Sequence, residues 1–100
     1  AEEGRRIAET LGDKPVLVMG NHGVSISAVT VAEAFEHLYF FERAAETLLK
    51  AYGTGQPLAI MSDNLAAKTA AEWEPYVGMG YAHFDYWKRD LDRSEPDYRD

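Results

Sequence analysis

The chain has 100 residues, of which 46% are hydrophobic and 27% are charged, a composition typical of a soluble globular segment and not of a disordered or fibrous chain. Its 17 acidic and 10 basic side chains give a formal charge of −7, which repels nucleic-acid phosphates and anionic lipid headgroups, so neither nucleic acid nor a membrane is expected as a partner. The sequence has no cysteine, which excludes disulfides and thiolate chemistry, and its longest apolar run is far too short to cross a bilayer, so we expect a cytoplasmic protein.

The first quarter of the chain predicts a helix followed by a β-hairpin. The opening residues are helix formers that stop at Gly12, the residue type that most easily adopts the left-handed conformation just past a helix end. The apolar run 16–19 predicts a strand buried on both faces, and the alternation of 24–27 predicts a second strand. Segment 20–23 reads Gly-Asn-His-Gly, which is turn composition, so His22 is expected at the hairpin tip.

The clearest predicted element is a long helix. Thr30 and Glu33 have capping-box spacing at its start, and Gly53 marks its end. Apolar residues recur along it at steps of three and four, which predicts one packed face opposite an exposed charged face. The packed set is Val31, Ala34, Phe35, Leu38, Phe41, Ala45, Leu48, Leu49 and Tyr52, and the exposed set is Glu33, Glu36, Arg43, Glu46 and Lys50. Tyr39 and Phe40 widen the apolar sector, which indicates a second packing surface on another part of the chain or another subunit.

The second half predicts two further helices. One begins at a cap provided by Ser62 or Asp63, and Pro75 breaks or restarts it. Another covers 81–91, where an apolar stripe returns. The charged remainder, 92–100, is expected to form a tail that is either ordered or frayed.

The three histidines are the first candidates for chemistry. From the residues alone, His22 is either a turn histidine that hydrogen-bonds locally or a metal ligand. A role as metal ligand requires further ligands nearby, because catalytic zinc takes about three protein ligands. His37 follows Glu33 by four residues and is expected to form a surface pair with it. His83 lies among aromatic residues and is either a core histidine or part of a pocket rim.

Several charged side chains are the second set of candidates. Glu42 falls on the apolar stripe of the long helix, where it either pairs with an arginine from a neighbouring element or makes a functional or inter-subunit contact; we favour the first. Lys88, Arg89 and Arg93 are expected to form a solvated helix face, although one arginine could instead reach an anionic substrate.

The order of these features resembles the class II aldolase and adducin family. The likeness is carried by Val16 to Gly23 (Val-Leu-Val-Met-Gly-Asn-His-Gly), by Thr30 with Glu33 to Phe35, and by Leu38 to Ala45. It implies an α/β fold, part of a three-layer α/β/α sandwich on a mostly antiparallel sheet, assembled as a homotetramer. Residues 1–100 would then be the C-terminal portion of a single domain whose upstream part is absent, in keeping with a start that lacks Met and lies within a predicted helix.

The resemblance also implies a function. His22 would be the third ligand of a divalent metal, zinc or manganese, with an upstream His-x-His motif and an upstream acid/base glutamate completing the site. The protein would be a metal-dependent carbon–carbon lyase, an aldolase or decarboxylase acting on a small molecule through an enolate or enediolate stabilised by the ion. A non-catalytic adducin-like binding or scaffold module is the alternative. His83 is a further candidate for substrate contact.

Two details qualify the likeness. The family commonly has glycine after the second strand, where this sequence has Ala28, which puts a tight backbone approach there in doubt. The C-terminal residues look more like those of the decarboxylase-like and adducin-like branch than those of the sugar-phosphate aldolases. The residues that carry this impression are Trp87, Arg89, Leu91, Asp92, Arg93, Pro96 and Tyr98.

Overall fold

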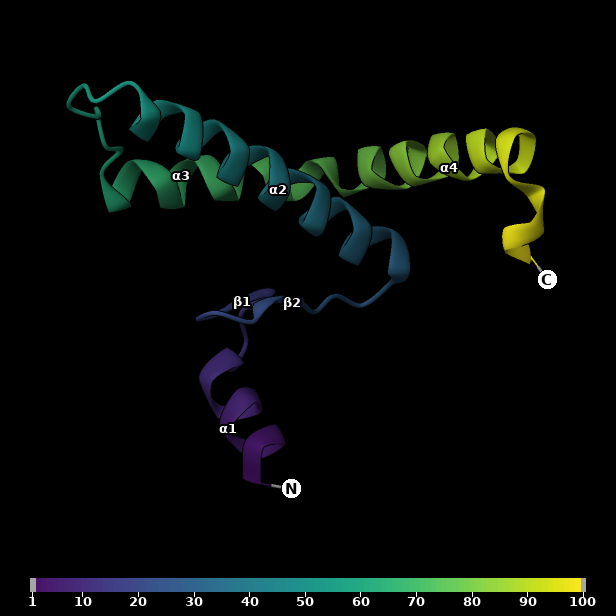
Figure 1. Cartoon of the computed structure of the whole chain (residues 1–100), viewed down its shortest axis with the longest axis horizontal. Coiled ribbons are helices and arrows are strands. Elements are labelled where there is room, and N and C mark those ends of the chain that lie inside the picture. Colours follow the sequence, from purple (N-terminus) through teal and green to yellow (C-terminus); the bar gives the residue numbers. More distant parts are fainter. Residues whose placement is uncertain (1, 100) are drawn as a thin grey trace.

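The computed structural model of the chain describes residues 2–99 and is mostly helical, with one small antiparallel hairpin. The elements in chain order are α1 (Glu2–Leu11), β1 (Val16–Met19), β2 (Gly23–Ile26), α2 (Val31–Gly53), α3 (Asp63–Trp73), the 3₁₀ helix η1 (Glu74–Tyr76), α4 (Val77–Ser94) and the 3₁₀ helix η2 (Pro96–Arg99). Figure 1 shows α2 crossing the line formed by α3 and α4, with α1 and the hairpin on one side of this helical layer. No helix within residues 2–99 is long and apolar enough to span a bilayer.

The sheet within residues 2–99 is the two-stranded hairpin that the sequence predicts. β1 and β2 pair antiparallel, with Val16 opposite Ile26 and Met19 opposite Gly23, and they are the two strands of residues 2–99. Antiparallel pairing is therefore confirmed, but these residues do not form a three-layer α/β/α sandwich, because two strands give too little sheet for helices to cover on both sides. The Cα radius of gyration of 16.8 Å agrees with this open arrangement, since a compact domain of this length has about 13 Å.

The prediction that strand 16–19 is buried on both faces is wrong for this structure. Val18 is 64% exposed, and the other three residues of β1 are half-buried. The reason is that the hairpin packs only lightly, through β1 against α1 and through β2 against α2. The apolar sequence of β1 therefore provides a surface that the described residues leave largely open.

The turn of the hairpin matches the sequence prediction and presents His22 at its tip. Residues 20–22 connect β1 to β2, and the backbone N–H of His22 donates to the carbonyl of Met19 at 3.2 Å. Asn21 has a φ of +57°, a left-handed conformation that asparagine tolerates better than most residues. At the end of the hairpin away from the turn, the N–H of Ser27 donates to the carbonyl of Pro15 at 2.8 Å. The strand pair is therefore hydrogen-bonded at both ends.

The predicted capping box at the start of α2 is present in both directions. The N–H of Glu33 donates to Thr30 Oγ1 at 3.2 Å, and the N–H of Thr30 donates to Glu33 Oε2 at 3.3 Å. The hydroxyls of Thr30 and Tyr81 are also 3.3 Å apart, which ties the start of α2 to α4. Two otherwise free backbone donors are thereby satisfied where the chain passes from the hairpin into the helix.

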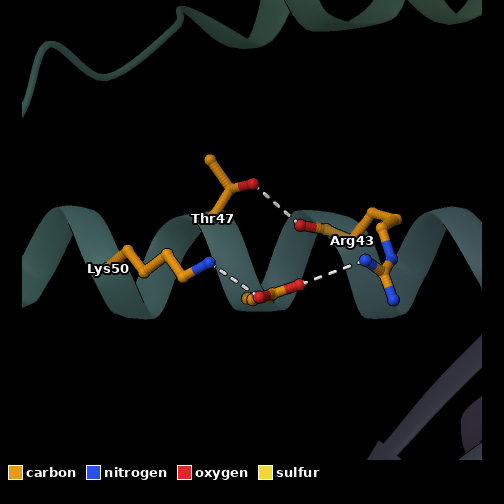
Figure 2. A network of polar contacts seen from close by, with 4 residues as sticks. Arg43, Thr47 and Lys50 are labelled. Atoms are coloured by element: carbon orange, nitrogen blue, oxygen red, sulfur yellow. Dashed lines mark hydrogen bonds and ion pairs between the residues drawn. The ribbon is translucent and has the colours of Figure 1, made fainter.

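Thr30→Ala is expected to lower the free energy of unfolding by about 1–2 kcal/mol, because it removes the cap and the contact with Tyr81 together. Thr47→Ala is the matched control on the same helix. Figure 2 shows the Thr47 hydroxyl bonded to the backbone of Arg43, a contact within one exposed turn whose loss should cost less than about 0.5 kcal/mol. Urea unfolding followed by circular dichroism measures both, and equal losses would contradict the capping role.

The packed face of α2 differs from the predicted stripe. Val31, Leu49 and Tyr52 are 74%, 72% and 63% exposed, whereas Ala32 is only 7% exposed. α2 packs mainly on α4, and the contact lies around Phe35 and Glu36, not along the whole apolar stripe. Residues 2–99 therefore cover only part of the apolar stripe of α2, and the rest of the stripe is exposed.

The elements of the second half follow the sequence prediction closely. Ser62 Oγ accepts from the N–H of Leu65 at 3.4 Å, so Ser62 caps α3. Pro75 lies in η1, where the chain changes from α3 to α4. The tail is ordered as η2 and folds back on the end of α4.

Candidate functional site

The imidazole of His22 is exposed at the hairpin tip. Its backbone makes the local hydrogen bond to Met19, but its ring takes part in none of the side-chain hydrogen bonds or ion pairs found among residues 2–99. The local hydrogen bond expected of a turn histidine is thus present, but it is made by the backbone of His22 and not by its exposed ring.

A complete metal site is not formed by the described residues. Within residues 2–99, no group of three or more His, Asp or Glu side chains is placed to hold a metal ion. This chain can offer the ring of His22 as one ligand, and an ion bound there would need its other ligands from elsewhere. The role of His22 as a metal ligand stays a prediction.

His83 lies between α2 and α4, with both of its ring nitrogens engaged. Nδ1 is 2.7 Å from Oε2 of Glu36, and the indole N–H of Trp87 donates to Nε2 at 2.9 Å. The rings of Phe35 and Tyr39 are 5.3 and 4.5 Å from the imidazole. His83 is thus a half-buried histidine of the helix contact, and in this arrangement neither nitrogen is free to contact a substrate.

The contact between α2 and α4 also uses Glu33, which the sequence places with Glu36 on an exposed face. The hydroxyl of Tyr81 donates to Glu33 Oε1 at 3.0 Å, and Glu36 is bonded to His83. The prediction of an exposed face is therefore wrong for these two glutamates, because α4 covers the first turns of α2. His37 is exposed, and its expected pairing with Glu33 is not present, since Thr30 and Tyr81 occupy that carboxylate.

A groove of about 720 Å³ lies between α2, α3 and the start of α4. Its apolar wall is formed chiefly by Phe40, Trp73, Tyr76 and Met79, and its polar edge by Glu33, Glu36 and His37. The rings of Phe40 and Trp73 are 6.0 Å apart, so the wide apolar sector of the long helix does contact a second part of the chain, as its sequence predicts. The glutamates on its edge disfavour an anionic occupant.

The remaining charged candidates lie at the surface. Glu42 is exposed and forms no ion pair with the described side chains, so the expected arginine partner is absent from residues 2–99. Arg93 pairs with Asp90 at 3.3 Å, and the Nζ of Lys88 lies 6.0 Å from the centre of the Phe84 ring. These two contacts and the exposure of Arg89 agree with a solvated helix face.

The tail is held by Asp92. The hydroxyl of Tyr98 and the guanidinium of Arg99 both bond to the Asp92 carboxylate. The hydrogen bond from Tyr98, and then that from Arg99, holds the pKa of Asp92 below its usual value. A lowered folded-state pKa means that the ionised carboxylate stabilises the docked tail above its unfolded pKa, and that this stabilisation is lost as the pH falls through the folded value.

The tail is accordingly expected to detach from α4 as the pH falls below the ordinary range of an aspartate and through the lowered folded-state pKa of Asp92. The measurement is the pH dependence of the Tyr98 ring resonances in an NMR titration. Asp92→Asn should give the detached spectrum already at neutral pH, whereas Asp97→Asn, a neutralised carboxylate on the same short helix, should titrate like the unchanged chain. A Tyr98 spectrum that ignores the Asp92 substitution would rule out this contact.

The chain is similar to a known protein family and to one named protein. Residues 1–49 match the family profile described as the Class II Aldolase and Adducin N-terminal domain, and these residues include all three segments that carry the resemblance noted above. The chain is 32% identical over 102 residues to a protein of Caulobacter vibrioides named "Putative aldolase class 2 protein". That alignment covers 99% of this chain and 39% of the relative, so the chain spans well under half of the relative's length. No solved structure matches.

Proposed function

Because this chain belongs to the class II aldolase and adducin family, we propose that the protein is a metal-dependent carbon–carbon lyase of the aldolase or decarboxylase type, in which His22 is one ligand of a divalent ion. The observation that carries the proposal is the position of His22. Its ring is exposed at the tip of a closed hairpin turn and is bonded to nothing else among residues 2–99. A ligand must be both accessible and oriented, and this turn supports both.

The turn is the contribution of this chain to the site. The bond from the His22 N–H to Met19 and the left-handed Asn21 fix the backbone from which the ring projects. The unprotonated imidazole is the form of histidine that binds a divalent ion such as zinc or manganese. The ion, when bound, would supply positive charge that stabilises the negative charge developing on substrate oxygens during bond cleavage.

The rest of the site belongs, in this proposal, to residues outside this chain. The aligned relative is more than twice as long as the matched region, which leaves room for further ligands and for an acid/base glutamate. Exposed apolar side chains such as Val18 and Leu49 support packing against further polypeptide, whether from the same protein or from other subunits of a homotetramer. The proposed substrate is a small molecule, and the proposed location is the cytoplasm.

The test is the metal requirement of the complete protein. Purified protein is expected to contain a divalent ion and to cleave a member of a panel of small hydroxycarbonyl compounds and acids. Chelation should abolish this cleavage, and zinc or manganese should restore it. A protein without bound metal and without cleavage of any panel member would refute the proposal and favour the adducin-like binding module.

A further inference from the structure

We infer that His83 is a pH-sensitive switch that exchanges a hydrogen bond from Trp87 for a charged pair with Glu36. The two partners of the His83 ring fix which ring nitrogen carries the proton. The indole nitrogen of Trp87 can only donate, so Nε2 of His83 must present a lone pair to it across 2.9 Å. The single proton of the neutral ring is then on Nδ1, which donates to Oε2 of Glu36 across 2.7 Å.

This arrangement can hold only while His83 is neutral. A proton taken up from solvent binds the Nε2 lone pair, and both ring nitrogens are then donors. The N–H of Trp87 loses its acceptor, and two N–H groups point at each other, so the indole must move. The bond from Nδ1 to the Glu36 carboxylate remains and becomes an ion pair in which both partners carry charge, which strengthens it. Protonation thus releases Trp87 while it strengthens the link between α4 and α2.

The surroundings favour a discrete switch. The side chains of His83 and Glu36 are only 24% and 23% exposed, so solvent does not readily replace the bonds between them. Because imidazole is the side chain that ordinarily changes charge between about pH 5 and 8, this is the range in which the exchange is to be sought.

The other titratable groups near His83 are bonded to other residues, lie along its own helix or, like His37 beside Glu36, are exposed on α2. On α2, the element packed against it, Glu33 accepts from Tyr81, and Arg43 lies 5.5 Å from the centre of the Tyr39 ring. Tyr39 presents its ring to the imidazole. On α4, the titratable side chains within one turn of His83 are Tyr81, Asp85 and Tyr86.

The released group, the indole of Trp87, lies in the C-terminal half of α4. Trp87 is 39% exposed, and its ring is 5.4 Å from that of Tyr86. The bond to His83 is the hydrogen bond that holds the indole N–H on α4. The switch therefore alters the surface formed by Tyr86 and Trp87, and not the docking of the two helices.

The experiment follows Trp87 directly in the full chain. The sequence has two tryptophans, so Trp73→Phe leaves Trp87 as the sole indole reporter. Lowering the pH from 8 to 5 is expected to shift its fluorescence emission to longer wavelength, because the released indole leaves the imidazole ring, 6.4 Å away in the neutral arrangement, and becomes more exposed to water. The indole N–H resonance should shift over the same pH range.

Two added substitutions separate the histidines. His83→Gln in the Trp73→Phe chain should abolish the transition, since an amide can bond to both Glu36 and Trp87 and does not titrate. His37→Gln should leave it unchanged, because His37 is exposed on α2 and is bonded to neither residue. A transition that survives His83→Gln, or none in the Trp73→Phe chain, would overturn the inference. Should His83→Gln fail to fold, ¹⁵N NMR of the unchanged chain decides: a proton on Nε2 at pH 8 would be equally contrary.

Discussion

His22→Ala is expected to lower the affinity of the complete protein for its divalent ion by more than about 100-fold, and to abolish cleavage with it. Residues that merely orient a metal ligand contribute about 10- to 100-fold to affinity, so loss of the ligand itself should cost more. Stability should change by less than about 0.5 kcal/mol, because the ring is exposed and its backbone bond to Met19 does not depend on the side chain.

His37→Ala is the matched control for this substitution. His37 is also an exposed histidine, but it lies on α2 beside the groove and not at the hairpin tip. Metal per chain, measured by elemental analysis after dialysis, should fall for His22→Ala and stay normal for His37→Ala. Normal metal content together with normal cleavage in the His22 variant would exclude the ligand role.

The parts of the structure that follow from the sequence are those decided by neighbouring residues. The capping box of Thr30 and Glu33 acts within one helical turn, and the turn before Gly23 acts within four residues. Pro75 separates α3 from α4, because a proline inside a helix lacks an N–H and clashes with the preceding turn. For such features the interacting residues are close together in the sequence, so residue type and spacing are enough to predict them.

The candidate contacts of α2 with α4 do not follow from local pattern. Glu36 and His83 are 47 residues apart, and Glu33 and Tyr81 are 48 apart. On a helix diagram Glu33 and Glu36 have the spacing of a solvated face, and nothing within a turn of them indicates that a second helix lies there. The useful signal is on α4. Gly80, Tyr81 and His83 lie within four residues near its start, and a Cβ on Gly80 would lie 3.2 Å from Glu36 Cγ.

The strand at 16–19 illustrates the opposite case, in which the local signal exceeds what the structure supplies. Four consecutive apolar residues predict burial on both faces, yet Val18 is largely exposed. Burial is a property of what packs on a strand, and the pattern cannot tell whether the covering residues belong to the same 100. The match of residues 1–49 to the family profile and the exposed strand both support the proposal that apolar faces of this chain pack against further polypeptide.

The small core that residues 2–99 do form is centred on Phe35. Its ring lies 5.5 Å from that of Phe84 and 5.3 Å from His83, both on α4, and 6.2 Å from Tyr39 one turn along α2. Aromatic pairs at these separations add to the free energy gained by burying their area. Phe35 therefore joins the apolar and the hydrogen-bonded parts of the contact between the two helices.

Phe35→Ala is expected to lower the free energy of unfolding by about 2–3 kcal/mol, somewhat less than for a fully buried phenylalanine because Phe35 is only half-buried. Leu49→Ala, on the same helix but 72% exposed, should cost less than about 0.5 kcal/mol in the isolated chain. Denaturant unfolding monitored by circular dichroism measures both. If Leu49→Ala cost as much as Phe35→Ala, the distal half of α2 would be packed in solution, and the contact with α4 would not be the principal core of this chain.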